Sequence, residues 1–257
     1  KKLEANLIVL CASTIQTIRI LLSSNEYNQS DNVINHSGLL GKNIMDHISV
    51  CRFFAYPKHN INQSKSIKDN EANLSGAGSF FIPLGNKFPE HRKADFLRGY
   101  GLWGAINRFD PPNILKKFPD TNIGFLIGHG EVLASETNKV TLSNLKNKTG
   151  IAVPHIDFSW GENEIKMVEH MKKTIKECID SAGGKIYKLS ELVETSVAKS
   201  FFDQSLALQD DAPPPGYYIH EVGGAQMGIN KETSVLDEFN RVWNCSNLLV
   251  VDGSCWP

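Results

Sequence analysis

A histidine beside a glycine-rich bend is the first group in the sequence with the means to do chemistry. His220 opens the segment His-Glu-Val-Gly-Gly-Ala-Gln-Met-Gly, which ends at Gly228 and follows a proline-rich stretch at 213–216. Histidine exchanges a proton near neutral pH, and glycines let the backbone approach a ligand closely or adopt positive φ. From these residues alone, a hydrogen-bonded structural histidine is narrowly favoured over a catalytic base.

A carboxylate follows the apolar segment near the C-terminal end. Residues 248–251 form an apolar run that closes on Asp252 and Gly253. The carboxyl end of a buried strand is where open α/β sheets bind their ligands. A simple turn or a helix cap explains the same residues, and without further information that reading is favoured.

A turn of small residues follows the apolar segment near the N-terminal end. Residues 7–10 are apolar and lead directly into Cys11, Ala12 and Ser13. A strand-to-helix turn of this kind can present backbone N–H groups to a phosphate. The sequence contains no G-x-G-x-x-G, G-x-S-x-G or P-loop motif, so the common nucleotide and hydrolase fingerprints are missing.

Strands and a helix at the chain ends must position these groups. A continuous apolar run such as 7–10 or 248–251 is typical of a strand covered on both faces, as in a parallel sheet. Residues 13–22 follow with apolar side chains on one helical face, and Ser13 or Thr14 can cap that helix. A strand that turns sharply into a helix is half of a βαβ unit. We therefore predict that both chain ends belong to one parallel-type layer.

The middle of the chain has the pattern of an antiparallel sheet with flanking helices. Polar loops are predicted over 24–38 and 58–75. A long helix is predicted over 165–179, where apolar residues recur every three or four positions until Gly183, and a second helix over 190–199. Strands are predicted at 49–56, 79–84, 123–133, 139–143 and 151–158.

Composition excludes several classes of protein. The chain has 257 residues, 41% of them hydrophobic, and a net charge of −1. Nucleic-acid binding needs a basic surplus, so we expect no nucleic-acid partner. There is no apolar run of the roughly 18 residues needed for a membrane span, and the N-terminus does not resemble a signal peptide. The five cysteines are scattered without metal-ligand spacing, so we expect no metal site, reduced thiols and a cytoplasmic location.

Five segments, in the same order along the chain, resemble the C-terminal part of the glucose-methanol-choline (GMC) flavin oxidoreductases. The most characteristic is 220–228, followed by 247–254. The remaining three, 7–22, 41–47 and 138–142, resemble the family's V-x-L-A-A-G-x-x-x-S/T-x-x-x-L-L, G-x-N-L-x-D-H and N-x-V-x-L patterns. Each match is loose by itself, but five matches in the correct order are specific.

The resemblance implies an α/β plus α+β fold. A partial FAD-binding layer of the Rossmann type would be formed by both chain ends, residues 1–24 and 218–257. The substrate-binding domain would be 25–217, an antiparallel sheet flanked by helices. The segment 41–47 would be structural. The resemblance thus agrees with the parallel-type strands predicted at the ends and the antiparallel strands predicted between them.

The resemblance also assigns residues to the FAD site. Cys11, Ala12 and Ser13 would lie against the ADP part of FAD, although the family usually has glycine at the position of Ser13. Asp252 and Gly253 would contact the ribitol-pyrophosphate region.

His220 corresponds to the family's catalytic histidine. Oxidation of an alcohol removes a hydroxyl proton and a hydride, and a neutral imidazole about 3 Å from the hydroxyl can accept the proton while flavin accepts the hydride. The small residues Gly223, Gly224 and Ala225 would leave room for the isoalloxazine ring. The substrate would be a small alcohol, sugar or polyol.

The matched segments cover only the C-terminal half of the family. The dinucleotide fingerprint belongs upstream of Lys1, and a second catalytic residue belongs beyond Pro257. We therefore expect the chain to need an N-terminal FAD-binding half as a partner, and to bind FAD poorly and lack activity without it. The alternative is a non-catalytic binding or structural remnant of such a domain.

Overall fold

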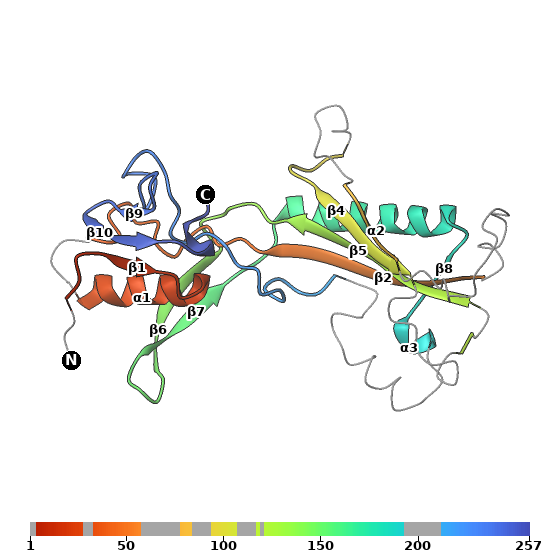
Figure 1. Ribbon diagram of the computed structural model, residues 1–257, viewed down its shortest axis with the longest axis horizontal. Coiled ribbons are helices and arrows are strands. Elements are labelled where there is room, and N and C mark those ends of the chain that lie inside the picture. Colours follow the sequence, from red (N-terminus) through yellow and green to blue (C-terminus); the bar gives the residue numbers. More distant parts are fainter. Residues whose placement is uncertain are drawn as a thin grey trace, which may run out of the picture. The chain divides into compact units, whose positions relative to one another are not determined.

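The chain folds into two compact units with separate hydrophobic cores (Figure 1). The first unit contains residues 1–47, 132–160 and 215–257, and the second contains 48–131 and 161–214. The computed structural model describes residues 4–27, 33–57, 78–83, 94–106, 117–118, 121–192 and 212–257.

The two ends of the chain meet in one sheet of the first unit. Strand β1 (Ile8–Leu10) pairs in parallel with β10 (Cys245–Val250), and β10 pairs antiparallel with β9 (Arg241–Val242). Figure 1 shows the red N-terminal strand and the blue C-terminal strand side by side. The prediction that both ends belong to a single layer is confirmed. That this layer is of the Rossmann type stays a prediction.

The prediction that the N-terminal strand is covered on both faces is wrong for this chain. Leu7, Ile8 and Val9 are 56%, 48% and 52% exposed. An apolar run indicates what a strand is suited to bury, and a sheet of three strands with its helix leaves much of that surface uncovered. Contiguous exposed apolar residues of this kind are typical of a contact surface.

Helix α1 (Thr14–Tyr27) supplies the core of the first unit. Ile18 and Leu21 are buried on the predicted face, and Leu21 packs in a cluster with Ala225 and Val250. The helix continues through 24–27, where a loop was predicted. A short 3-10 turn, η5 (Gly253–Cys255), follows β10 at the other side of this core.

Two internal segments pack with the chain ends, beyond the limits predicted for the FAD-binding layer. The hairpin of β6 (Lys139–Lys146) and β7 (Ala152–Asp157) belongs to the first unit, as do residues 33–47. Gly41 connects them, because its N–H donates to the Gly224 carbonyl at 2.6 Å and its carbonyl accepts from Val140 N–H at 2.7 Å. The division into an FAD-binding and a substrate-binding domain stays a prediction.

The second unit is a five-stranded sheet with a long helix on one face (Figure 1). Helix α2 (Glu162–Ser181) ends before Gly183, whose φ is +73°, so the predicted helix and its stop are confirmed. A four-residue helix, α3 (Leu189–Leu192), lies within the second predicted helix, of which 193–199 fall outside the described residues. The strands, in sheet order, are β3 (Gly78–Ile82), β4 (Tyr100–Ile106), β5 (Thr121–Glu131), β2 (His47–Pro57) and β8 (Lys185–Tyr187).

Glycines on β5 let α2 approach the sheet closely. A Cβ atom at Gly128 would lie 2.3 Å from the sulfur of Met171, and one at Gly130 would lie 2.6 Å from the sulfur of Met167. Both methionines are fully buried. The helix packs closely on the sheet because β5 has no side chain at these two positions. The space is filled by long, flexible methionine side chains of the helix.

The remaining structural findings concern the cysteines, membrane spans and one predicted loop. All five cysteines are free thiols. Among the described residues, no helix is both long and apolar enough to cross a membrane. The predicted loop 58–75 lies outside the described residues.

A buried tyrosine anchors α2 to β4 beside a histidine whose pKa is lowered. The Tyr100 hydroxyl lies 2.7 Å from Nδ1 of His170 and 2.8 Å from Thr174 Oγ1. Burial lowers the pKa of His170, the charge of Lys173 lowers it further, and Glu177 opposes both. The unfolded chain, in which a histidine titrates near 6.5, therefore binds more protons than the folded chain in the window below that value.

We expect the free energy of unfolding to fall as the pH drops from about 6.5 through the lowered pKa of His170. The variant His170→Gln cannot take up this proton and should lack that part of the slope. Urea titrations at several pH values, followed by the circular dichroism signal of the helices, measure the effect. An identical slope in the variant and the parent chain would contradict the prediction.

Candidate active site

Three segments that the sequence singled out are hydrogen-bonded to one another in the first unit. The hydroxyl of Thr14, at the start of α1, donates to the Glu221 carbonyl at 2.6 Å. The N–H of Gly223 donates to the Gly253 carbonyl at 2.9 Å. The helix start, the glycine-rich segment after His220 and the turn after β10 therefore form a single site, although more than 200 positions separate Thr14 from Glu221.

The carboxylate of Asp252 holds the turn together. Its Oδ2 accepts from the Thr17 hydroxyl at 2.5 Å, and its Oδ1 accepts from the N–H and hydroxyl of Ser254 at 3.0 and 2.6 Å. Thr17 Oγ1 in turn accepts from the Ala12 N–H at 3.0 Å. Three acceptor positions of this carboxylate are thus occupied within the chain, so Asp252 organises the site through contacts with its own neighbours.

The turn before α1 is open to solvent. Cys11, Ala12 and Ser13 are all exposed, and α1 carries no acidic residue in its first turn. Backbone N–H groups at a helix N-terminus favour an anionic ligand. The accessibility of the turn and the chemistry of its donors therefore fit the phosphate-binding role predicted for these three residues.

Ser13 has a backbone conformation that favours glycine. Its φ is +70°, in the left-handed region, where a side chain costs roughly 1–2 kcal/mol. Glycine adopts this conformation without the steric cost. This agrees with the glycine that is usual at this position in the family that the sequence resembles.

We expect Ser13→Gly to stabilise the first unit by about 0.5–1 kcal/mol, since relief of the left-handed strain is partly offset by the greater freedom of glycine in the unfolded chain. The matched control is Ser23→Gly in the middle of α1, which should destabilise by roughly 0.5 kcal/mol because glycine is a poor helix former. Denaturant unfolding followed by tryptophan fluorescence reports mainly on this unit, which contains three of the four tryptophans. Equal effects of the two substitutions would contradict the interpretation.

The glycines after His220 are required by packing within the chain. Gly223 and Gly224 have φ values of +84° and +91°. A Cβ atom at Gly223 would lie 2.3 Å from the Asn43 carbonyl oxygen, and one at Gly224 would lie 2.4 Å from a methyl group of Ile18. Ala225 is fully buried. The structure thus gives these small residues a second role, and the room they were predicted to leave for a flavin ring stays a prediction.

His220 is exposed and lies among other rings. The ring of Tyr218 is stacked at a centroid distance of 6.5 Å and an interplanar angle of 23°. The ring of His47 meets that of His220 at 5.1 Å and 80°, an edge-to-face arrangement. The sequence predicted 41–47 to be structural, so it missed the proximity of His47. The only signal was an acid–histidine pair, Asp46-His47, within a segment that resembled the family.

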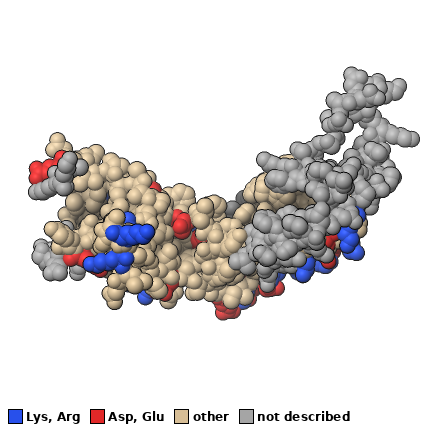
Figure 2. Space-filling model, turned by 90° about the horizontal axis from the view of Figure 1, so that it is seen from below, with Lys and Arg blue, Asp and Glu red and all other residues tan. Residues whose placement is uncertain are grey.

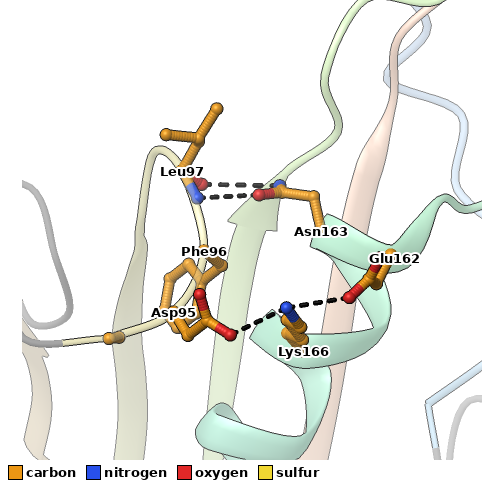
Figure 3. Close-up of a pocket in the computed structure, with 7 residues that line it drawn as sticks. Asp95, Phe96, Leu97, Glu162, Asn163 and Lys166 are labelled. Carbon is orange, nitrogen blue, oxygen red and sulfur yellow. Dashed lines mark hydrogen bonds and ion pairs between the residues drawn. The ribbon is translucent and has the colours of Figure 1, made fainter.

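A hollow lies at the N-terminal end of α2 in the second unit (Figure 3). Lys166 forms ion pairs with Asp95 at 2.7 Å and with Glu162 at 2.8 Å, which lowers the pKa of Asp95 and raises that of Lys166. The side-chain amide of Asn163 accepts from the N–H of Leu97 and donates to its carbonyl. These polar groups satisfy one another, so the hollow has no evident reactive group.

Charges are mixed on the molecular face shown in Figure 2. Basic and acidic side chains of the described residues lie among large areas of uncharged surface. This distribution matches the net charge of −1.

Comparison with known proteins identifies relatives along almost the whole chain. Residues 134–257 match the sequence model of a family described as GMC oxidoreductase. The chain is 28% identical, over 98% of its length, to a 2-methyl-1,2-propanediol dehydrogenase from Mycolicibacterium austroafricanum and covers 44% of that protein. It is 23% identical, again over 98% of its length, to the gluconate 2-dehydrogenase flavoprotein of Pantoea cypripedii and covers 41% of it. The chain therefore spans less than half the length of these curated relatives.

A solved structure shares the fold. A formate oxidase from Aspergillus oryzae RIB40, solved in a study of FAD modification, superposes with a TM-score of 0.51 and 18% identity. The match covers 98% of this chain and 50% of that one.

The fold is a mixed α/β architecture, and the comparisons align the chain with the C-terminal half of GMC oxidoreductases. Residues 134–257 match the GMC oxidoreductase family, and the chain as a whole is similar to the C-terminal region of such proteins. The resemblance drawn from five sequence segments is thereby confirmed.

Proposed function

We propose that this chain is the C-terminal part of an FAD-dependent oxidoreductase that acts on CH–OH groups, with His220 as the catalytic base. The observation that carries the proposal is the convergence of the predicted residues. The segment that follows His220 is hydrogen-bonded to the start of α1 through Thr14 and to the turn after β10 through Gly253.

The exposed turn at the start of α1 supports the proposed cofactor. Cys11, Ala12 and Ser13 present the N-terminus of a 14-residue helix, which suits the diphosphate of a dinucleotide. Asp252 keeps this turn in shape through Thr17, and Gly253 brings the second chain segment against it. When bound, FAD supplies the acceptor for the hydride that leaves the substrate carbon.

The role of His220 follows from its exposure and its chemistry. A neutral imidazole within about 3 Å of a substrate hydroxyl accepts the proton as the C–H bond breaks. The proton then rests on the imidazole until it passes to solvent, which the exposed position of His220 permits. Asp252, which is committed to Thr17 and Ser254, takes no part in this transfer.

The substrate class follows from the relatives. Their names describe dehydrogenases of a diol and of gluconate, both of which carry CH–OH groups. We therefore propose a small alcohol, sugar or polyol as the substrate. We also propose that an N-terminal FAD-binding half completes the enzyme, in agreement with the 44% of the diol dehydrogenase that this chain covers, and that the enzyme is cytoplasmic.

The domain roles follow the same assignment. Residues 1–24 and 218–257 would belong to the FAD-binding layer and 25–217 to the substrate-binding domain. The segments 33–47 and 132–160, which pack with the chain ends, would support the FAD-binding side structurally.

The proposal is tested with the enzyme that contains this chain. Purified protein should carry flavin, and anaerobic addition of a panel of alcohols, sugars and polyols should bleach the oxidised-flavin absorption band. The chain by itself, mixed with FAD, should neither bind it stoichiometrically nor show substrate-dependent bleaching. Protein without flavin and without any bleaching substrate would instead support the alternative, a non-catalytic remnant.

A further inference from the structure

His47 and His220 are cross-strand neighbours in a short antiparallel ladder. Met45 and Val222 exchange both backbone hydrogen bonds, each at 2.9 Å. In an antiparallel ladder, residues two steps along from such a pair are again opposite each other. That rule places His47 opposite His220, and the 5.1 Å between their ring centroids agrees with it. The contact between the two imidazoles is thus set by the backbone register.

A buried carboxylate fixes the backbone on both sides of this pair. Asp46 is only 6% exposed, and its Oδ1 accepts the N–H of His47 at 2.7 Å. The backbone N–H of His220 also donates to it. Burial is the largest influence on Asp46 and raises the pKa of its carboxyl, while the two N–H donors act in the opposite direction. One side chain therefore ties the two histidine backbones together.

The ring of His47 limits the orientations open to the ring of His220. His220 is exposed, so its side chain would otherwise be free to change rotamer. The edge-to-face contact with the half-buried His47, at an interplanar angle of 80°, is an arrangement that aromatic rings favour. Tyr218 contacts the same imidazole with nearly parallel ring planes. His220 is therefore exposed to solvent, yet two neighbouring rings restrict the orientation of its imidazole.

We propose that His47 is a positioning residue for His220, held in place by Asp46 and by the ladder register. This proposal rests on the proposed function, because it concerns the base of that reaction. A base acts only when its nitrogen reaches the substrate proton within about 2.6–3.2 Å. Misplacement of a reacting group by about 1 Å can slow a reaction by roughly 100-fold. A His220 ring held in one orientation should therefore give a faster proton transfer than a mobile ring.

The first test needs no cofactor and uses the full chain. NMR relaxation of the His220 ring carbons should report an ordered ring in the parent chain and a more mobile ring in His47→Ala. The variant His47→Phe keeps an aromatic edge and should keep the ring ordered. Circular dichroism verifies that each variant is folded. A His220 ring that is equally ordered in His47→Ala and in the parent chain would overturn the proposal.

The second test measures flavin reduction in the FAD-loaded enzyme. His47→Ala should lower the limiting rate roughly 10- to 100-fold with little change in KM, because the substrate still binds but meets a disordered base. His47→Phe should recover most of the rate. The control is His155→Ala in the same unit, where an exposed histidine forms an ion pair with Asp157, and this variant should behave like the parent.

The two proposals fail in different ways. If His220→Ala leaves flavin reduction unchanged, the proposed base is wrong, whatever His47 does. If His220→Ala is severely slow but His47→Ala reduces flavin at the parent rate, only the positioning role is wrong. A rise in KM with an unchanged limiting rate in His47→Ala would also overturn it, since that result indicates substrate binding.

Discussion

Replacing His220 by alanine should slow flavin reduction in the FAD-loaded enzyme by about 10²–10⁴-fold, the usual contribution of a positioned general base. This corresponds to roughly 3–5 kcal/mol of the activation free energy. The physical reason is that hydride transfer from an alcohol leaves a protonated carbonyl unless the hydroxyl proton is removed at the same time. Stopped-flow mixing of the enzyme with substrate, without oxygen, measures the rate directly.

The flavin content of this variant distinguishes a lost base from a lost site. The His220 side chain is exposed and is not part of the hydrogen bonds that join Thr14 to Glu221 or Gly223 to Gly253. We therefore expect His220→Ala to bind as much FAD as the parent. Added imidazole should restore part of the rate by occupying the vacated space and accepting the proton. A near-parent rate of reduction would remove the base assignment.

The elements with strong periodicity could be predicted from the sequence. Helix α2 buries Val168, Met171, Ile175 and Ile179 at the spacing from which it was predicted, while Ile165 is exposed, and Gly183 follows it in a left-handed conformation. That the two chain ends share one layer was likewise predicted from their apolar runs; their direct parallel pairing, with Ile8 opposite Leu248, was found in the structure.

Strand β4 could not be predicted, because its glycines hide its pattern. The segment Tyr100–Ile106 has Gly101 and Gly104 where a strand normally has side chains. In the structure, the ring of Phe81 lies where a Cβ of Gly101 would be, and the ring of Phe80 lies against Gly104. The neighbouring strand β3 thus supplies the side chains that β4 lacks. Such compensation depends on pairing and is invisible in one segment alone.

The candidate residues could be singled out from the sequence, but their contacts could not. His220, Asp252 and the turn at Ser13 received their predicted roles from the family resemblance, and the hydrogen bonds of Thr14 and Gly223 bring their segments together. The approach of His47 to His220 could not be predicted, because it depends on the register between segments more than 170 residues apart in the sequence. A change of one residue in that register would turn His47 to the opposite face.

Gly223→Ala should destabilise the first unit by roughly 2–5 kcal/mol. The φ of +84° costs about 1–2 kcal/mol for any residue with a Cβ atom. The added carbon would also lie 2.3 Å from the Asn43 carbonyl oxygen, and forcing an atom into a packed site costs roughly 1–3 kcal/mol. The clashing atom belongs to the backbone, so no change of rotamer relieves the contact.

Gly38→Ala is the matched control, because it has nearly the same φ of +72° but no atom within 4 Å of the added Cβ. We expect a loss of only about 1–2 kcal/mol there, from the backbone conformation alone. The difference between the variants isolates the close approach of the glycine-rich segment to residues 43–45. Urea unfolding followed by tryptophan fluorescence measures both, since Trp160, Trp243 and Trp256 lie in the first unit. Equal losses of stability in the two variants would show that the backbone near Gly223 can accommodate the added Cβ atom. A much larger loss at Gly223 would mean that the close packing of this segment against residues 43–45, which also places His47 beside His220, requires glycine at position 223.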